Sequence, residues 1–593
     1  MKKHAYLKKA ISAVLALVLL VSLCGCSRDE YEWLSSVAEW ASREAENYTL
    51  DPSWPTGILP PATDTAAPTT KAPDDKTETA APVSSALIPE YREITKEEFS
   101  ALCDELKAAA SGNDFGKIRT LYDKIYSEFE QVNDNYTLSY IAYCREVSNE
   151  SLKQKYQDLE ELAIDLSDLA LQAFRSVTQG PCAKQFKSYV DDEPFEYFSE
   201  YEDMTDQEKE WEKRETELVT QYNSIMDEYG DLIWQQDDYV NSLVGPIYLE
   251  LVQLRTEKAK FYGYDNYADY ADENVYYRDY DKAAAEKFHE AVKQISGDYY
   301  TLLYYTNAYF GIQNVYTSMT ATQLVDKLGS ISAKISPLAT EYYQRLTDYK
   351  LYDISSASGR LDAGYTTNFE TTDTAFIFIT SDDGPRDFMT LSHEFGHFIN
   401  MNLIQNPNLF VYGSSMDLNE IHSNGFEALC SNYFSDVYGM DADAAVSACL
   451  MELLMNVIDG CIYDEFQRKV YANPKMTLEE INDCYQSILY SYGDYYMNKY
   501  IWQYVNHNFE APMYYLSYAA SGIVALQIWQ KSQTDFKEAV KMWEDIQKAG
   551  PYDYGYFELL DNLDILTFDN KSNVVDVCED VLDYLLDLNP IKF

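Results

Sequence analysis

The sequence predicts a mainly α-helical protein with a small β-sheet, and two observations support this fold class. Beyond residue 90 the chain is a succession of helical patterns rich in Leu, Ala, Glu, Lys and Tyr, such as SLKQKYQDLEELAIDLSDLALQAF and PIYLELVQLRTEKAKFYGY. The clearest β signal is the apolar run from Ala375 to Thr380, and the turn sequence Asp-Asp-Gly-Pro follows it at 382–385. With 593 residues, the chain can bury a large core.

The composition limits the classes of partner. The formal net charge is −52, which argues against a nucleic-acid partner, because such a partner needs stripes of Lys and Arg. The 54 tyrosines and 46% hydrophobic residues argue against a disordered polyanion. We therefore expect a folded protein with an acidic, solubilising surface.

The first residues are typical of an export signal. Four lysines precede an apolar run from Ala10 to Leu23 that is short for a membrane span. The run ends in Leu-Cys-Gly-Cys, which resembles the bacterial lipobox and implies a signal peptide over residues 1–25 with Cys26 as the lipidated mature N-terminus. Cys24 fits less well, because Leu23 would occupy the small-residue position; an ordinary secretory signal is the alternative. We expect a chain anchored by lipid to the bacterial cell membrane, outside the cytoplasm.

The next segments differ in composition from the rest. Residues 26–50 form the lipidated N-terminus, and within them residues 30–47 have the pattern of a short amphipathic helix. Residues 51–90 are rich in Pro, Thr and Ala without apolar periodicity, which is typical of a linker. One large domain over residues 91–593 follows.

The motif His393-Glu394-Phe395-Gly396-His397 carries the strongest chemical signal. On a helix, histidines four residues apart share one face and can both bind a tetrahedral zinc ion. A glutamate beside them accepts a proton from the water that zinc activates. Only five histidines remain beyond the signal peptide, so this spacing is hard to attribute to chance. The sequence predicts one bound Zn²⁺, with His393 and His397 as ligands and Glu394 as the catalytic base.

A third protein ligand must come from elsewhere, so that the fourth position is left for water. Downstream, residues 416–429 have the pattern of a helix on which Glu420 and Glu427 share a face. Asp417 is an alternative ligand, because Gly413–Asp417 loosely resembles the signature of aspartate-ligated zinc peptidases. His422 points about 200° around the helix from Glu420, so we predict a packing role for it. His289, alone in an amphipathic helix, is also predicted to be structural.

The motif HEFGH followed by a helix with E-x6-E resembles the thimet oligopeptidase, neurolysin and oligopeptidase F family of zinc peptidases, over about residues 95–590. The resemblance implies a two-lobed, neurolysin-like helical domain with an N-terminal lobe at about 91–240 and a catalytic part at about 241–593. It implies a channel between the lobes that excludes folded proteins. It also implies that Glu420 is the third ligand and that Glu427 supports a ligand histidine, which favours Glu420 over Asp417.

The segment from Trp502 to Ala519 resembles the C-terminal stretch of that family, where a histidine and closely spaced tyrosines face the zinc. The resemblance implies that His507, Tyr515 and Tyr518 stabilise the oxyanion, with Tyr514 as an alternate. NFEAPM replaces the glycine-rich linker of the thimet-type members, as in the oligopeptidase F-like branch. Ordinary aromatic packing is the alternative for each tyrosine.

In zinc peptidases of this type, an edge strand beside the motif helix pairs with the extended substrate. We predict this role for Phe376, Ile377 and Phe378; a core strand is the alternative.

These observations predict a zinc-dependent oligopeptidase that hydrolyses internal bonds of short unfolded peptides. We expect a monomer, attached to the membrane through its lipid alone and without a nucleic-acid partner. A dipeptidyl carboxypeptidase-type exopeptidase is an alternative that the sequence does not separate. A non-catalytic peptide-binding lipoprotein would be expected to lack Glu394 or a ligand, and a zinc-scavenging lipoprotein would be expected to carry a His-rich tract.

Overall fold

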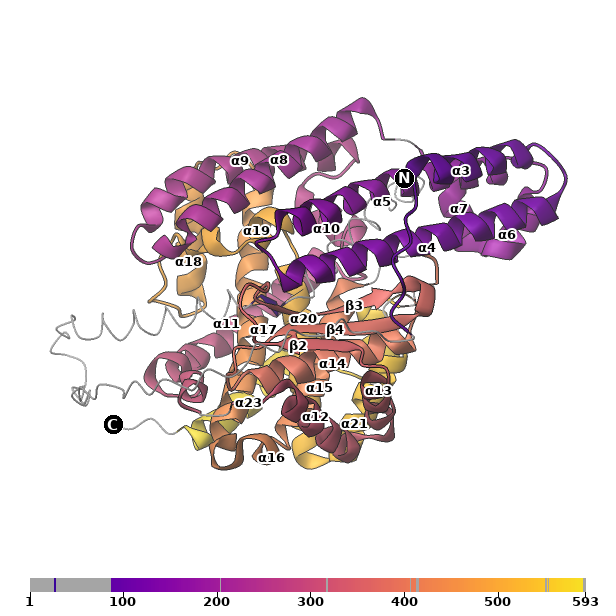
Figure 1. Cartoon of the computed structure of the whole chain (residues 1–593). Helices are drawn as coiled ribbons and strands as arrows, with labels where there is room; N and C mark the ends of the chain where they lie inside the picture. The colour runs from indigo at the N-terminus through magenta and orange to yellow at the C-terminus, as the bar shows by residue number, and fades with distance from the viewer. Residues whose placement is uncertain are drawn as a thin grey trace.

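The structure is a computed structural model that describes residues 26–27 and 87–589, except 203, 316–317, 406, 412–414, 550–551 and 553. The predicted signal peptide, the helix predicted at 30–47 and nearly all of the predicted linker lie outside the described residues. The described chain is predominantly helical with one small sheet, so the predicted fold class is confirmed (Figure 1). The first helices are α3 (Lys96–Ala110), α4 (Phe115–Arg145), α5 (Glu150–Thr178), α6 (Ala183–Val190), α7 (Asp192–Glu200), α8 (Asp206–Tyr229), α9 (Asp237–Phe261), α10 (Tyr267–Asn274), α11 (Lys282–Tyr305), α12 (Ala321–Ile335) and α13 (Pro337–Asp348).

The remaining helices follow the sheet in the chain. They are α14 (Asp387–Leu403), α15 (Met416–Ser431), α16 (Ser435–Tyr438), α17 (Ala442–Ala472), α18 (Leu478–Ser491), α19 (His507–Glu510), α20 (Tyr515–Thr534), α21 (Phe536–Ala549), α22 (Tyr556–Asn562) and α23 (Lys571–Leu588). Local sequence fixes several helix starts. At α8, for example, the Thr205 side chain accepts from the Glu208 backbone N–H while the Glu208 carboxylate accepts from the Thr205 backbone N–H.

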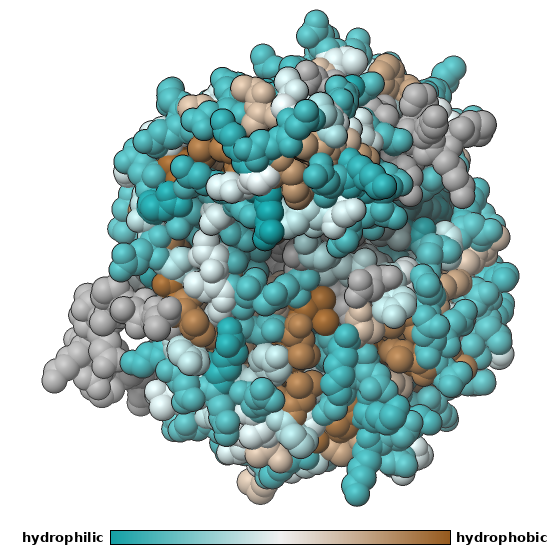
Figure 2. Space-filling view, turned by 90° about the vertical axis from the view of Figure 1, so that its right-hand side faces the viewer, coloured by the Kyte–Doolittle hydropathy of each residue, from teal (hydrophilic) through white to brown (hydrophobic). Residues whose placement is uncertain are grey.

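The buried apolar side chains of the described residues form two clusters. Helices α3 to α7, which project at the upper right of Figure 1, pack around residues such as Phe99 and Phe174, and residues 409–411 join them. Leu218 and Tyr222 on α8 belong to the larger cluster, which continues to the C-terminal helix. Ile141 and Cys144, at the C-terminal end of α4, also belong to the larger cluster, so α4 contributes to both. The face of the molecule shown in Figure 2 is hollowed between its upper and lower halves.

The sheet has the strand order β1 (Cys26–Ser27), β3 (Ala363–Phe369), β4 (Thr374–Thr380) and β2 (Tyr352–Ser355). β4 pairs antiparallel with β3 and parallel with β2. On β3, Tyr365 packs against Tyr140 of α4, with ring centroids 5.6 Å apart, while the next residue, Thr366, bonds to α14. The sheet therefore lies between α4 and the motif helix α14 (Figure 1).

The predicted role of Phe376, Ile377 and Phe378 as a substrate-binding edge is wrong. They lie on β4, where Ile377 pairs with Tyr352 on one side and with Thr366 on the other. All three side chains are buried, so this is the core strand that the sequence analysis kept as its alternative. The strand beside α14 is β3. One side of β3 pairs with β4, and on its outer side, among the described residues, only Cys26 and Ser27 of the short strand β1 pair with it.

One described helical run, Ser435–Ala472, is long and apolar enough to cross a membrane by length and composition alone. Within its most apolar window, 78% of the residues are buried inside the protein. It contacts α20 and α11 and acts here as a core helix.

Candidate metal centre

Helix α14 presents the histidine motif deep in the protein, against helix α15. Gly396, inside the motif, allows this close approach. A Cβ atom at this position would lie 2.4 Å from the His422 carbonyl oxygen and 2.5 Å from the Ser423 Cα. Gln547 of α21 joins the two helices at the same point, because its side-chain amide donates to the carbonyl oxygens of Gly396 and His422. The two helices that supply the predicted ligands are therefore held in direct contact.

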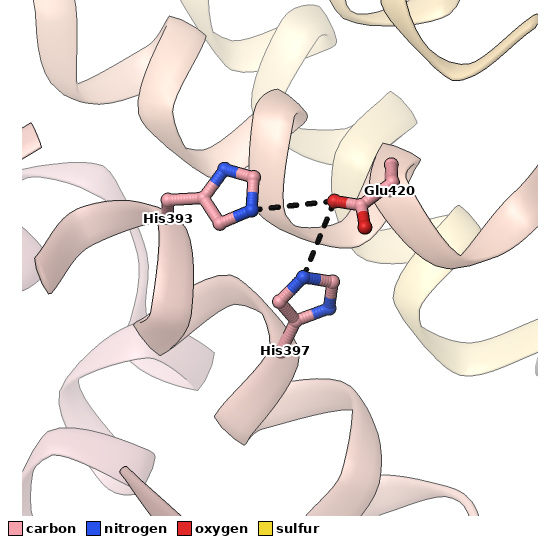
Figure 3. A group of neighbouring side chains, drawn as sticks. All are labelled: His393, His397 and Glu420. Carbon is pink, nitrogen blue, oxygen red and sulfur yellow. Dashed lines mark ion pairs between the residues drawn. The ribbon is translucent and has the colours of Figure 1, made fainter. Parts of the chain in front are cut away.

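The structure brings together His393, His397 and Glu420, which form the metal group (Figure 3). Glu420 Oε2 lies 3.2 Å from His393 Nε2 and 3.3 Å from His397 Nε2. One potential ligand atom from each residue lies within 4.8 Å of the other two, and all three side chains are buried. Burial alone would raise the pKa of Glu420, but the neighbouring imidazoles outweigh it and hold the pKa well below its ordinary value. The carboxylate is therefore charged, as a metal ligand must be.

Glu427 lies on the same face of α15 as Glu420, about two helical turns further along the helix. Its Oε2 is 3.6 Å from His393 Nδ1, on the opposite side of the ring from Glu420. A carboxylate at this position fixes the ring orientation and leaves Nε2 free for a metal. The predicted support of a ligand histidine by Glu427 fits this geometry.

Asp417, the alternative third ligand, is occupied by other partners. Its carboxylate accepts hydrogen bonds from Tyr280 OH at 2.5 Å and Ser517 Oγ at 2.5 Å, and Arg278 Nε lies 3.3 Å from each oxygen. The side chains of both Asp417 and Arg278 are fully buried. Asp417 thus anchors the start of α15 and does not join the histidines.

The Glu394 carboxylate lies between the metal group and the sheet. Thr366 Oγ1 of β3 donates to Glu394 Oε2 at 2.8 Å, whereas Oε1 has no hydrogen-bond partner among the described residues. Burial raises the pKa of Glu394, and the two histidines and Thr366 oppose this shift. A glutamate with a raised pKa is suited to accept and release a proton near neutral pH.

His507 lies in an aromatic group with the predicted tyrosines. The centroid of its ring is 5.3 Å from that of Tyr514, in a stacked arrangement, 5.2 Å from that of Tyr515 and 6.0 Å from that of Tyr518. Burial lowers the pKa of His507 to about 4, so the ring is neutral at pH 7 and carries one N–H donor. Neither ring nitrogen has a hydrogen-bond partner among the described residues. Ser517, between these tyrosines, bonds to Asp417 and so ties this group to α15.

His422 and His289 lie outside the metal group. His422 Nδ1 lies 3.1 Å from the Asn419 carbonyl oxygen, and burial lowers its pKa to about 3. His289 Nε2 is 2.8 Å from Asp464 Oδ2, in a buried network with Arg468. Both are packed side chains, in agreement with the sequence analysis.

Several residues of the site carry no signal in the sequence. Thr366 and Gly364 of β3 lie in a polar segment without a clear strand pattern, and Gly364 is so close to α14 that a Cβ would meet Thr390 Cγ2 at 2.7 Å. Arg278 acts on a carboxylate 139 positions away, so no local pattern could reveal it. A cluster of acidic side chains beside the motif helix also has no local signal.

No protein-family profile and no curated protein matches this sequence. Solved structures do match. PZ peptidase A with an inhibitor aligns with a TM-score of 0.67 and 19% identity over 84% of this chain and 98% of that one. A Bacillus anthracis protein assigned as an oligoendopeptidase F gives 0.66 and 19% over 85% and 99%. A Chlamydophila abortus protein assigned as a peptidase gives 0.58 and 14% over 83% and 96%. This chain therefore has the fold of these proteins along most of its length.

Proposed function

We propose that this chain is a zinc-dependent oligopeptidase of the thimet oligopeptidase and oligopeptidase F family, which hydrolyses internal bonds of short peptides. The observation that carries the proposal is the buried convergence of His393, His397 and Glu420, beside Glu394 Oε1, which has no hydrogen-bond partner among the described residues. The fold shared with oligoendopeptidase F and PZ peptidase A supports it.

The donor set fits zinc. Two imidazoles and one carboxylate are typical of catalytic sites that leave a position open for water. A zinc ion held there would lower the pKa of a water molecule to about 7 and polarise the scissile carbonyl. The nearby Glu427 carboxylate would keep the His393 ring oriented toward the ion.

Different side chains transfer the proton and stabilise the oxyanion. Glu394 accepts the proton of the attacking water on Oε1, while Thr366 holds Oε2, and Glu394 then passes the proton to the leaving amine. His507 donates a hydrogen bond to the carbonyl oxygen as that oxygen becomes negative, together with Tyr515 or Tyr518. For this step the low pKa of His507 is favourable, since the ring stays neutral and keeps its orientation by stacking on Tyr514.

We propose further that the protein acts outside the cytoplasm as a monomer attached to the bacterial cell membrane through a lipid on Cys26. The lipobox-like sequence supports this location. Cys26→Ser would then move the chain from the membrane fraction to the soluble fraction, and metabolic labelling with palmitate would label the unmodified chain alone.

The catalytic proposal is tested by mass spectrometry of a mixed peptide library incubated with the zinc-loaded full chain. We expect cleavage of short peptides, loss of at least about 100-fold in rate for Glu394→Gln, and loss of activity with a chelator. Glu538→Gln, an exposed change at the start of α21, is the matched control and should cleave normally. If Glu394→Gln cleaves as fast as the unmodified chain, the proposal fails.

A further inference from the structure

A cavity of about 90 Å³ opens beside the metal group, between the first half of α14, the start of β3 and helices α15 and α17. His393, Glu394 and Gly364 line it. Glu394 is fully buried, and its Oε1, the atom assigned to proton transfer, has no hydrogen-bond partner among the described residues. The cavity therefore adjoins the carboxylate that is assigned to proton transfer.

The lining of this cavity carries an excess of negative charge. The carboxylates in it belong to Asp362, Asp382, Asp387, Glu394, Glu427 and Glu452, while Arg386 is the single Lys or Arg among the lining residues. Arg386 forms an ion pair with Glu452. A divalent ion at the metal group would still leave carboxylates in excess, so the cavity favours a cationic group.

Some of these carboxylates have structural roles. Asp387 accepts from Ser381 Oγ at 2.7 Å at the start of α14, and Glu427 faces His393. Asp362 and Asp382 are exposed and stand on the segments that lead into β3 and out of β4. These two carboxylates are the ones best placed to meet an incoming side chain.

The edge of β3 gives the direction in which a peptide would run past the cavity. In the structure Cys26 pairs with Gly364, and Ser27 pairs with Ala363, in an antiparallel arrangement. A peptide that adds to the same edge in the same direction would lead its C-terminal half past Gly364 toward Ala363 and Asp362. These residues line the cavity, so a peptide bound in this direction would bring to it the residues that lie C-terminal to the position opposite Gly364.

We propose that this acidic cavity binds a lysine or arginine side chain immediately C-terminal to the bond that is cleaved. The inference rests on the proposed peptidase function and adds its substrate preference. The same charge repels a free α-carboxylate close to the scissile bond, which favours cleavage within peptides over removal of C-terminal dipeptides.

The test uses the zinc-loaded full chain and quenched fluorescent peptides that differ only in the residue C-terminal to a single cleavable bond. We expect kcat/KM for the Lys and Arg peptides to exceed that for the Glu peptide by about tenfold or more, since ion pairs with several carboxylates add up. Combined Asp362→Asn and Asp382→Asn changes should lower the Lys-to-Leu ratio about threefold or more. Asp382→Lys should shift the preference toward the Glu peptide.

Asp576→Asn, an exposed change on α23, is the control and should leave the Lys-to-Leu ratio unchanged. Binding to Glu394→Gln, measured by fluorescence anisotropy with the same peptides, should rank Lys and Arg above Glu without any turnover. Cleavage without a basic preference, or a preference that Asp382→Lys does not alter, would overturn the inference and leave the peptidase function standing. If no peptide is cleaved, the peptidase proposal fails, and an anisotropy ranking that does not favour Lys and Arg overturns the inference separately.

Discussion

Replacing Gly396 with alanine should separate the two helices that carry the proposed metal ligands. The added Cβ would lie 2.4 Å from the His422 carbonyl oxygen and 2.5 Å from Ser423 Cα, whereas carbon atoms in ordinary contact are about 3.5–4.0 Å apart. Because both neighbours are backbone atoms of α15, neither can swing away as a side chain could. The helices must therefore move apart by about 1 Å, the shortfall in these two contacts.

This displacement is large on the scale of metal binding. Ligand distances in a zinc site hold to within about 0.2 Å, and a 1 Å misplacement can cost about 100-fold in rate. Overpacking of this kind costs about 1–3 kcal/mol in unfolding free energy, and alanine's better helix propensity returns about 0.5–1 kcal/mol of it. We expect Gly396→Ala to be modestly destabilised, to bind zinc far more weakly, and to lose at least about 100-fold in kcat/KM.

Gly297→Ala is the matched control, because Gly297 is also inside a helix and a Cβ there would meet nothing within 4 Å. It should be as stable as the unmodified chain or more stable, by up to about 1 kcal/mol. Zinc content measured by atomic absorption, a competition titration for zinc and urea unfolding give the three quantities. If Gly396→Ala binds zinc and cleaves peptides like the Gly297→Ala control, the close contact of α14 and α15 does not position the ligands.

Other changes separate the roles of the residues around the metal. Glu420→Ala should abolish zinc binding. Asp417→Ala should leave the ligands in place and cost about 1–3 kcal/mol in stability, because the buried Arg278 keeps Asp272 as a charged partner while Tyr280 and Ser517 lose their acceptor. Zinc loss from Asp417→Ala alone would reverse the assignment. Glu427→Gln should weaken zinc binding by about 10–100-fold in a competition titration, since the ring of His393 loses its charged partner. The pKa of His422 falls from 6.5 to about 3 on folding, so only the unfolded chain takes up this proton below pH 6.5, and stability is lost as the pH falls. Between pH 6.5 and 5 the loss from this group is about 2 kcal/mol, and urea midpoints of the metal-free protein at pH 7.5 and 5 should differ less in His422→Gln than in the unmodified chain.

The parts of the site that sequence could predict are those set by local helix geometry. His393 and His397 share a face because they are four residues apart, and Glu420 and Glu427 share one because they are seven apart. The choice between Glu420 and Asp417 was not local. It depends on Arg278 and Ser517, which reach Asp417 from distant parts of the chain and occupy its carboxylate. The acidic cavity could not be predicted from local sequence for the same reason, because its carboxylates come from four separate segments of the chain.

The error over the substrate strand has a different physical cause. The run around Phe376–Phe378 gave the strongest β signal because it is apolar at every position, and that pattern is typical of a strand that is covered on both faces and paired on both edges. A strand that keeps one edge open for a peptide has the opposite requirement. One edge of its backbone must stay available for pairing, and it must pass close to the proposed catalytic carboxylate. On β3 the described pairs of the outer edge end at Gly364, and Thr366 donates to Glu394. In a zinc peptidase of this architecture, the weaker β pattern beside the motif helix is therefore the better candidate for contact with substrate.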